Sequence, residues 1–190
     1  MKHSLLLRYV LPFIQWYVLM ILTTIGIDYM LHHYQLAWVG RYLGYVGTLL
    51  VLLSFIYSLR KRKILKAGSP KKLLKLHEYL AWVGSVLLLV HAGIHFNAIL
   101  PWLAVAMLLI NVASGLVGKF LLKRSMDSLQ ENRQALADKG MDKESVDKHL
   151  FFDSIMVNAM KQWRNIHLPI ALIFGLISLL HIITVFIFSK

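Results

Sequence analysis

Long apolar stretches separated by polar ones fill most of this chain, and their lengths are typical of membrane-spanning helices. The hydrocarbon core of a bilayer requires about 20 predominantly apolar residues per helix. Five segments meet this requirement: residues 9–31, 38–59, 76–95, 100–122 and 166–188. The first is too long for a signal peptide and no small-residue cleavage site follows it, so we expect it to be retained. The pattern predicts an all-α membrane protein, a five-transmembrane-helix bundle forming one domain over residues 1–190.

The largest polar region, residues 123–164, also predicts helices. A charged helix is expected over residues 125–139, because Gly140 follows it as the usual left-handed residue beyond a helix end. Asp142 can cap a second helix. In that helix the apolar residues between 152 and 163 fall on one face. Such a face is typical of an interfacial helix on the bilayer, of a docking surface, or of a helix packed back on the bundle. The fold class therefore includes a cytoplasmic amphipathic helical loop.

The distribution of charge gives the expected orientation. The chain has 21 Lys and Arg against 9 Asp and Glu, with a formal net charge of +12. Apart from Arg41 and Lys190, these basic residues lie before the first span, between spans two and three, or between spans four and five, with Lys119 in the last turn of span four. Basic residues concentrate on the cytoplasmic side of membrane proteins. We therefore expect a multi-pass protein of the cell (inner) membrane with a cytoplasmic N-terminus and an extracytoplasmic C-terminus.

The same distribution identifies the expected partners. The basic residues follow the membrane topology, so the predicted partner is anionic membrane lipid and no nucleic acid. The chain has no cysteine, which excludes disulfides, cysteine-ligated iron–sulfur clusters and covalent attachment of c-type haem.

Histidines in the third and fifth spans form a matched pattern. His77 and His91 are 14 residues apart, as are His167 and His181. Fourteen residues make about 3.9 helical turns, so the two histidines of each span share one helix face and lie roughly 21 Å apart along the helix axis. The two spans run in the same direction because two crossings separate them. His77 is therefore level with His167, here called the first pair, and His91 with His181, the second pair.

A b-type haem iron with two axial histidines requires two imidazoles that face each other at one depth. Zinc would require a third and a fourth ligand at each level, and no suitable carboxylate or thiol is present. A single histidine within a membrane is more often a helix–helix hydrogen bond or a proton relay. Two matched pairs on parallel helices favour two haems, with the four histidines as iron ligands.

Glycines near the histidines fit this hypothesis. Gly84 lies midway between His77 and His91, and Gly175 lies close to midway between His167 and His181, so each could leave room for a porphyrin edge. Ordinary helix packing explains either glycine equally well. Packing is also the expected role of a further set of glycines in the second span, which consists of Gly40, Gly44 and Gly47.

Other histidines leave alternatives open. His95 is 18 residues, or about five turns, beyond His77, so it rivals His91 as a ligand; otherwise it would lie near haem propionates or a quinone headgroup. Asp28 and His32, one turn apart in the first span, form either a proton path or a surface pair. The remaining histidines are expected to be exposed, namely His3, His33 and His149.

This pattern resembles the ferric reductase-like transmembrane family, which includes NADPH oxidases and bacterial haem-containing relatives. The resemblance lies in His77 and His91 in LHEYLAWVGSVLLLVHAGIH and in His167 and His181 in NIHLPIALIFGLISLLH, and covers about residues 9–189. It implies two stacked b-type haems. That family commonly has a sixth span, and its reductases add a flavin and nicotinamide domain, which this chain lacks. No G-x-G-x-x-G loop is present, so no direct use of NAD(P)H is expected.

The sequence predicts transmembrane electron transfer through two bis-histidine haems. The protein would be the membrane subunit of an oxidoreductase rather than a complete enzyme. Electrons would be exchanged with a redox partner protein or a quinone, and residues 60–75 and 123–164 would dock a cytoplasmic donor. The alternative is a non-redox transporter or anchor that uses imidazoles for protons or metal.

Overall fold

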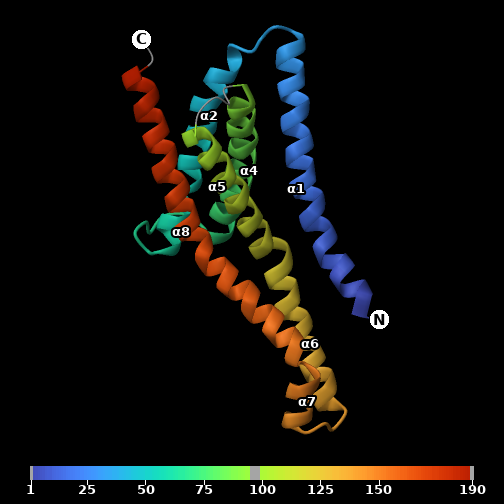
Figure 1. Cartoon of the computed structure of the whole chain (residues 1–190). Helices are drawn as coiled ribbons and strands as arrows, with labels where there is room; N and C mark the ends of the chain where they lie inside the picture. Colours follow the sequence, from blue (N-terminus) through green and yellow to red (C-terminus); the bar gives the residue numbers. More distant parts are fainter. Residues whose placement is uncertain (1, 95–98, 189–190) are drawn as a thin grey trace.

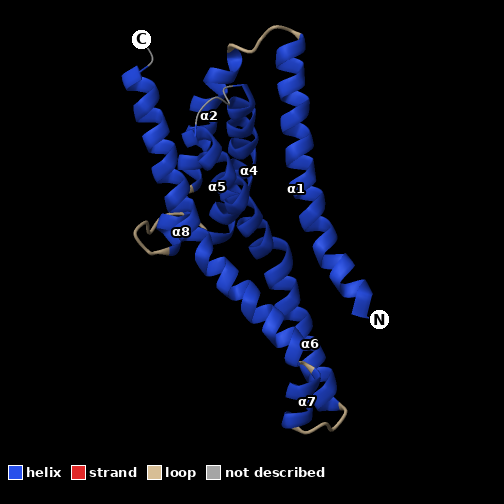
Figure 2. Cartoon of the chain, in the orientation of Figure 1, coloured by secondary structure: helices blue, strands red, loops and turns tan. Residues whose placement is uncertain are grey.

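The computed structural model describes residues 2–94 and 99–188, and throughout these residues the protein consists of helices joined by short loops, with no strand (Figure 2). The helices, in chain order, are α1 Lys2–His33, α2 Val39–Ser54, α3 Ile56–Lys61, α4 Pro70–Ile94, α5 Ile99–Leu116, the π-helix η1 Val117–Leu122, α6 Lys123–Asp138, α7 Lys143–His149 and α8 Phe151–Phe188. His95, the alternative ligand, lies outside the described residues.

Five helical stretches are long and apolar enough to cross a membrane, which confirms the predicted fold class. They are Val10–His33, Val39–Lys61, Pro70–Ile94, Ile99–Asp138 and Phe151–Phe188. Each expected segment falls within one of them apart from its outermost residues. The outward surfaces of these helices carry exposed leucine, isoleucine, valine and phenylalanine side chains, as surfaces in contact with lipid do.

The helices pack mainly in two sets. α2 lies along α4, and α5 lies along α8, while α1 packs on α4. A small core joins them, formed by Met20, Val86, Leu89, Val90, Leu108 and Phe174. α8 packs on α5 and η1 and does not pack along α4. The α4 and α8 helices, which carry the four predicted ligands, are therefore held apart by their neighbours.

Glycines bring α2 close to α4. A Cβ on Gly47 would lie 3.1 Å from the carbonyl oxygen of Gly84, and a Cβ on Gly84 would lie 3.1 Å from that of Gly47. A Cβ on Gly40 or Gly44 would meet Ile94 or His91, respectively. The predicted packing role of the α2 glycines is confirmed, and Gly84 serves the same contact.

Two very long helical stretches extend beyond the bundle at one end. Residues 99–138 are continuously helical through α5, η1 and α6 over 40 residues, and α8 is 38 residues long. At 1.5 Å per residue each is close to 60 Å, about twice the hydrocarbon thickness. Their extensions, residues 123–165, form an antiparallel hairpin closed by α7, here called the arm (Figure 1).

The arm corrects one expectation. Gly140 has a positive φ of 76° beyond α6, and Asp142 caps the next helix by accepting a hydrogen bond from the Ser145 N–H at 3.3 Å. That helix, α7, ends already at His149. The apolar stretch from 152 to 163 instead belongs to α8 and is continuous with the fifth span, so it does not form a separate interfacial helix. Pro169 lies inside α8 and lacks an N–H, so it removes one helical hydrogen bond, but the helix continues on both sides of it from the bundle into the arm.

Candidate functional site

The second histidine pair is brought together by the structure. The ring centres of His91 on α4 and His181 on α8 lie 6.4 Å apart, with 55° between the ring planes. A metal ion lies about 2.0 Å from an imidazole nitrogen that ligates it, and that nitrogen lies about 1 Å from its own ring centre. Two imidazoles on opposite sides of one metal ion therefore have ring centres about 6 Å apart. The observed separation matches this distance.

The hydrogen bond made by His91 determines which of its two ring nitrogens carries the proton. Its Nδ1 lies 2.9 Å from the carbonyl oxygen of Gly40 on α2. A carbonyl oxygen only accepts, so Nδ1 carries the proton and Nε2 is the unprotonated nitrogen, the one through which this ring could ligate a metal. Metal-ligating histidines usually donate their other N–H in this way. Gly44 is level with the same ring, where a Cβ would lie 2.8 Å from the ring atoms Cγ and Nδ1.

His77 of the first pair is held in the same manner. Its Nδ1 donates to the carbonyl oxygen of Ser54 on α2 at 3.0 Å. Ser54 is the last residue of α2, and carbonyls at a helix C-terminus lack intrahelical donors. The break between α2 and α3 therefore supplies an acceptor at the level of His77. The ring of Tyr57 on α3 lies beside it, with ring centres 5.5 Å apart.

His167 is held by a side chain, in addition to a backbone contact with Asn111. Its Nδ1 is hydrogen-bonded to Ser114 Oγ on α5, and Ser114 Oγ donates its own proton to the carbonyl oxygen of Asn111 at 2.7 Å. Ser114 is only 1% exposed. Because its proton is used, Ser114 accepts from His167 Nδ1, which again leaves Nε2 for a ligand. His167 is also close enough to His77 and to Lys61 for their charges to act on it.

The surroundings of the two pairs include other polar groups. Lys119 on η1 pairs with Glu78 on α4 at 2.8 Å, and its ammonium lies 5.7 Å from the ring centre of Trp16 on α1. Asn111 Oδ1 is buried and has no hydrogen-bond partner among the described residues. Buried amide oxygens are rarely left unpaired, so this atom marks a position where a bound group or water can be accommodated.

The two predicted glycines differ. The missing side chain of Gly84 is used by the close approach of α2, with Val51 Cγ2 2.9 Å from where its Cβ would be. A Cβ on Gly175 would meet nothing within 4 Å. Gly175 is therefore exposed on the surface of α8 and contacts no other described helix, while Gly84 is occupied by helix packing.

The Asp28–His32 pair does form. His32 Nδ1 lies 2.9 Å from the backbone oxygen of Asp28 and 3.7 Å from its carboxylate. Asp28 Oδ1 is buried, without a hydrogen-bond partner in the described part of the chain. Gly93 of α4 lies against it, where a Cβ would be 3.3 Å away.

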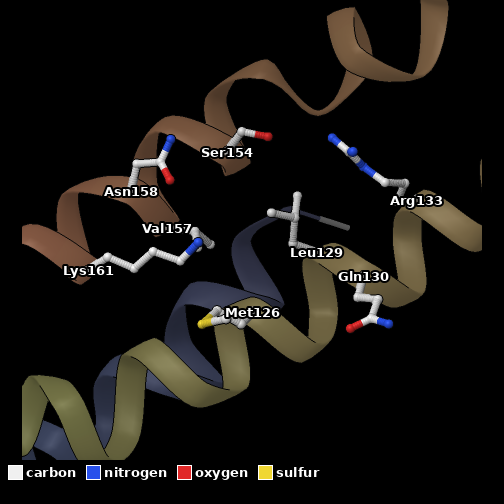
Figure 3. A pocket seen from close by; sticks show the side chains of 8 residues that line it. All are labelled: Met126, Leu129, Gln130, Arg133, Ser154, Val157, Asn158 and Lys161. Carbon is white, nitrogen blue, oxygen red and sulfur yellow. The ribbon is translucent and has the colours of Figure 1, made fainter. Parts of the chain in front are cut away.

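The hollow in the arm is separate from the histidines. It has a volume of about 390 Å³ between α6 and α8 (Figure 3). The residues that line it are Met126, Leu129, Gln130, Arg133, Ser154, Val157, Asn158 and Lys161. Arg133 is already paired with Asp147 at 2.8 Å. None of the four predicted ligands contributes to this hollow.

Sequence reasoning missed the groups that orient the histidines. Gly40 and Ser54 are themselves 14 residues apart, the spacing of His77 and His91, so α2 presents two carbonyls in register with α4. The sequence carries no signal for these acceptors, because every residue has a backbone carbonyl. Among the described residues no three metal-binding side chains come together, whereas two axial histidines suffice for a haem iron.

None of the family models, curated proteins or solved structures compared with the chain matches it.

Proposed function

We propose that this protein transfers electrons across a membrane through two b-type haems, one between His77 and His167 and the other between His91 and His181. The observation that carries the proposal is the 6.4 Å separation of the His91 and His181 rings. It is supported by the hydrogen bonds that hold Nδ1 of His77, His91 and His167 and so orient the three rings. A bound haem supplies reversible one-electron chemistry at its iron.

The chain's own residues provide the ligands, their orientation and the apolar surroundings. Two histidines fill both axial positions of an iron, so the site favours electron transfer over activation of a bound substrate. The two pairs are about 21 Å apart along the helices, a large part of the roughly 30 Å hydrocarbon core. The protein acts as the membrane subunit of an oxidoreductase system and exchanges electrons with a partner protein or a quinone.

Haem content is the direct test of this proposal. Purified protein is expected to be red, with a b-type reduced-minus-oxidised spectrum and about two haems per chain by pyridine haemochrome analysis. His149→Ala is a suitable control, since His149 is exposed in the arm and its loss should leave both haems. A colourless protein from cells supplied with haem would contradict the proposal and favour the non-redox transporter or anchor.

The proposed orientation follows from the basic residues at the end of the bundle that carries the arm. A reporter inserted at Gly140 should be cytoplasmic, and one fused after residue 190 should be extracytoplasmic. The opposite result would invert the orientation and leave the pairing of the histidines unchanged.

A further inference from the structure

The segment between α2 and α4 has an unusual charge. Residues 60–75 contain eight basic residues and no acidic one: Arg60, Lys61, Arg62, Lys63, Lys66, Lys71, Lys72 and Lys75. All except Arg60 are exposed. The four ion pairs in the described part of the chain involve none of them. We call this segment the basic segment, and no acidic side chain of residues 2–94 or 99–188 forms an ion pair with it.

The arm, at the same end of the molecule, is different. Residues 123–165 contain acidic and basic residues in similar numbers, and the arm pairs them internally, as Arg133 does with Asp147 and Lys148 with Glu144. A strong attraction for an anionic surface therefore belongs to the basic segment alone.

The basic segment surrounds the first histidine pair. α4 begins at Pro70, so His77 lies about 10 Å along the helix from its start, directly after Lys71, Lys72 and Lys75. On the other side, α3 carries both Tyr57, whose ring contacts His77, and Lys61, whose charge acts on His167. The segment is also held in shape, because Arg60 Nε donates to the carbonyl oxygen of Gly68 at 3.1 Å.

We propose that the basic segment is the docking site for an acidic electron-carrying protein, which delivers electrons to the first histidine pair. This inference rests on the proposed function and adds the chemistry of the partner. Each encounter moves one electron: the carrier is oxidised and one ferric iron is reduced to ferrous. Weak electron-transfer encounters bury little surface, below about 1,200 Å². Complementary charge around the entry point increases their rate of association, by about tenfold or more.

A lipid headgroup offers the same negative charge, and the position of the segment decides between the two. Lipid would interact with basic residues anywhere along the membrane boundary. Here the unbalanced charge lies next to the first pair, because Lys71, Lys72 and Lys75 precede His77 on α4 and Lys61 interacts with His167, while the arm is charge-balanced.

The test uses full-length protein in nanodiscs of uncharged phosphatidylcholine, so that no anionic lipid is present. The probe is an acidic [2Fe–2S] ferredoxin. The variant replaces Lys71, Lys72 and Lys75 together with Gln, which preserves helix propensity. The control replaces Lys139, Lys143 and Lys148 of the arm with Gln, the same loss of charge at exposed positions. Binding is measured on haem-free protein, and the reduction rate on haem-loaded protein.

We expect the Lys71, Lys72 and Lys75 variant to bind ferredoxin about tenfold more weakly at low salt, and its haem to be reduced about tenfold more slowly. The control should remain within about twofold of the parent protein. The difference should disappear at about 1 M salt, where the Debye length is only ~3 Å.

Equal binding by the two variants would overturn the proposal. So would a parent protein that ignores ferredoxin but enriches anionic lipid in mixed nanodiscs through the same lysines. The protein could also bind ferredoxin through these lysines and yet take up no haem when haem is supplied. That result would support the docking site and contradict only the proposed function.

Discussion

The two histidine pairs share one spacing, but different groups hold them in place. In the second pair His91 is oriented by a backbone carbonyl, that of Gly40, and its ring is packed tightly against Gly44. In the first pair His167 is oriented by a side chain, Ser114, and a lysine and a tyrosine lie nearby. Backbone carbonyls thus orient one histidine of each pair, His91 in the second and His77 in the first. The pairs differ at His167, whose side-chain partner Ser114 a single substitution can remove.

This difference has a consequence for tuning. A backbone acceptor cannot be removed by substitution, so the orientation of His91 is insensitive to side-chain changes except those that alter packing. The Ser114–Asn111 relay can be removed by one substitution without a change of helix packing. The first pair is thus the one whose reduction potential and affinity can be adjusted by its neighbours.

Removal of the ligands should have the largest effect and should separate the pairs completely. His167→Ala is expected to lose the haem of the first pair and to keep the other, whereas His181→Ala should do the reverse. Each variant should contain about one haem per chain, with different redox midpoints. If His91→Ala retained two haems while His95→Ala lost one, the ligand of the second haem would be His95.

Ser114→Ala should have the next largest effect, confined to the first pair. Loss of a hydrogen bond to a metal-ligating histidine typically lowers metal affinity by about 10–100-fold. The measurement is haem retention during competition with apomyoglobin, together with the midpoint potential of each haem. Ser114→Thr keeps the hydroxyl and should restore both values, which a purely structural role of this residue would not require. A change in the second haem alone would contradict the assignment.

Gly44→Ala tests the second pair through packing. The new Cβ would lie 2.8 Å from the His91 ring, and such overpacking costs about 1–3 kcal/mol. We expect partial loss of the second haem and an intact first haem. The matched control is Gly115→Ala, where the Cβ would lie at an ordinary 3.5 Å from Cε1 of His167. Equal effects of the two substitutions would mean that tight packing is not what distinguishes the pairs.

The smallest effect is expected in the arm, far from both pairs. Hydrogen bonds from the side chain and backbone N–H of Ser145 hold the pKa of Asp142 below its ordinary value. Because the folded pKa is the lower one, the cap stabilises α7 above the ordinary Asp pKa of about 3.9. That stability is lost as the pH falls through the folded value.

Amide exchange in α7 measures this loss. Protection should fall at acidic pH in the parent protein and should be independent of pH in Asp142→Asn, which keeps a capping side chain. Haem content should not change in either protein. Loss of haem with the cap would show that the arm and the pairs are coupled.

Much of the helical architecture was predictable because it depends on local rules. Apolar length identified five spans, and Gly140 and Asp142 marked the turn between α6 and α7. The extent of α8 was not predictable, because residues 152–163 have a polar face that reads as a separate helix while nothing at residues 164–166 stops the helix. The π-helical form of Val117–Leu122 likewise has no composition that announces it.

For the candidate site, the sequence predicted which histidines face each other, since spacing along parallel helices determines depth. The proximity of His91 and His181 confirms that geometry. The sequence could not predict that the carbonyls of Gly40 and Ser54 accept hydrogen bonds from the histidines. Every residue has a backbone carbonyl, and only the tertiary structure selects two of them. Ser114 was missed for a related reason. A serine in an apolar helix usually bonds to its own backbone, and only the position of α8 shows that it also holds His167.

The 14-residue interval between Gly40 and Ser54 on α2 equals the interval between His91 and His77 on α4, so the two helices must keep the same spacing. One residue inserted between Gly40 and Ser54 would rotate one carbonyl by about 100° and move it about 1.5 Å relative to the other. His77 and His91 could then no longer both meet their acceptors while α2 stayed a regular helix. Evolution can vary the side chains along this stretch except at the glycines that pack against α4, but it can change the number of residues only in both helices together.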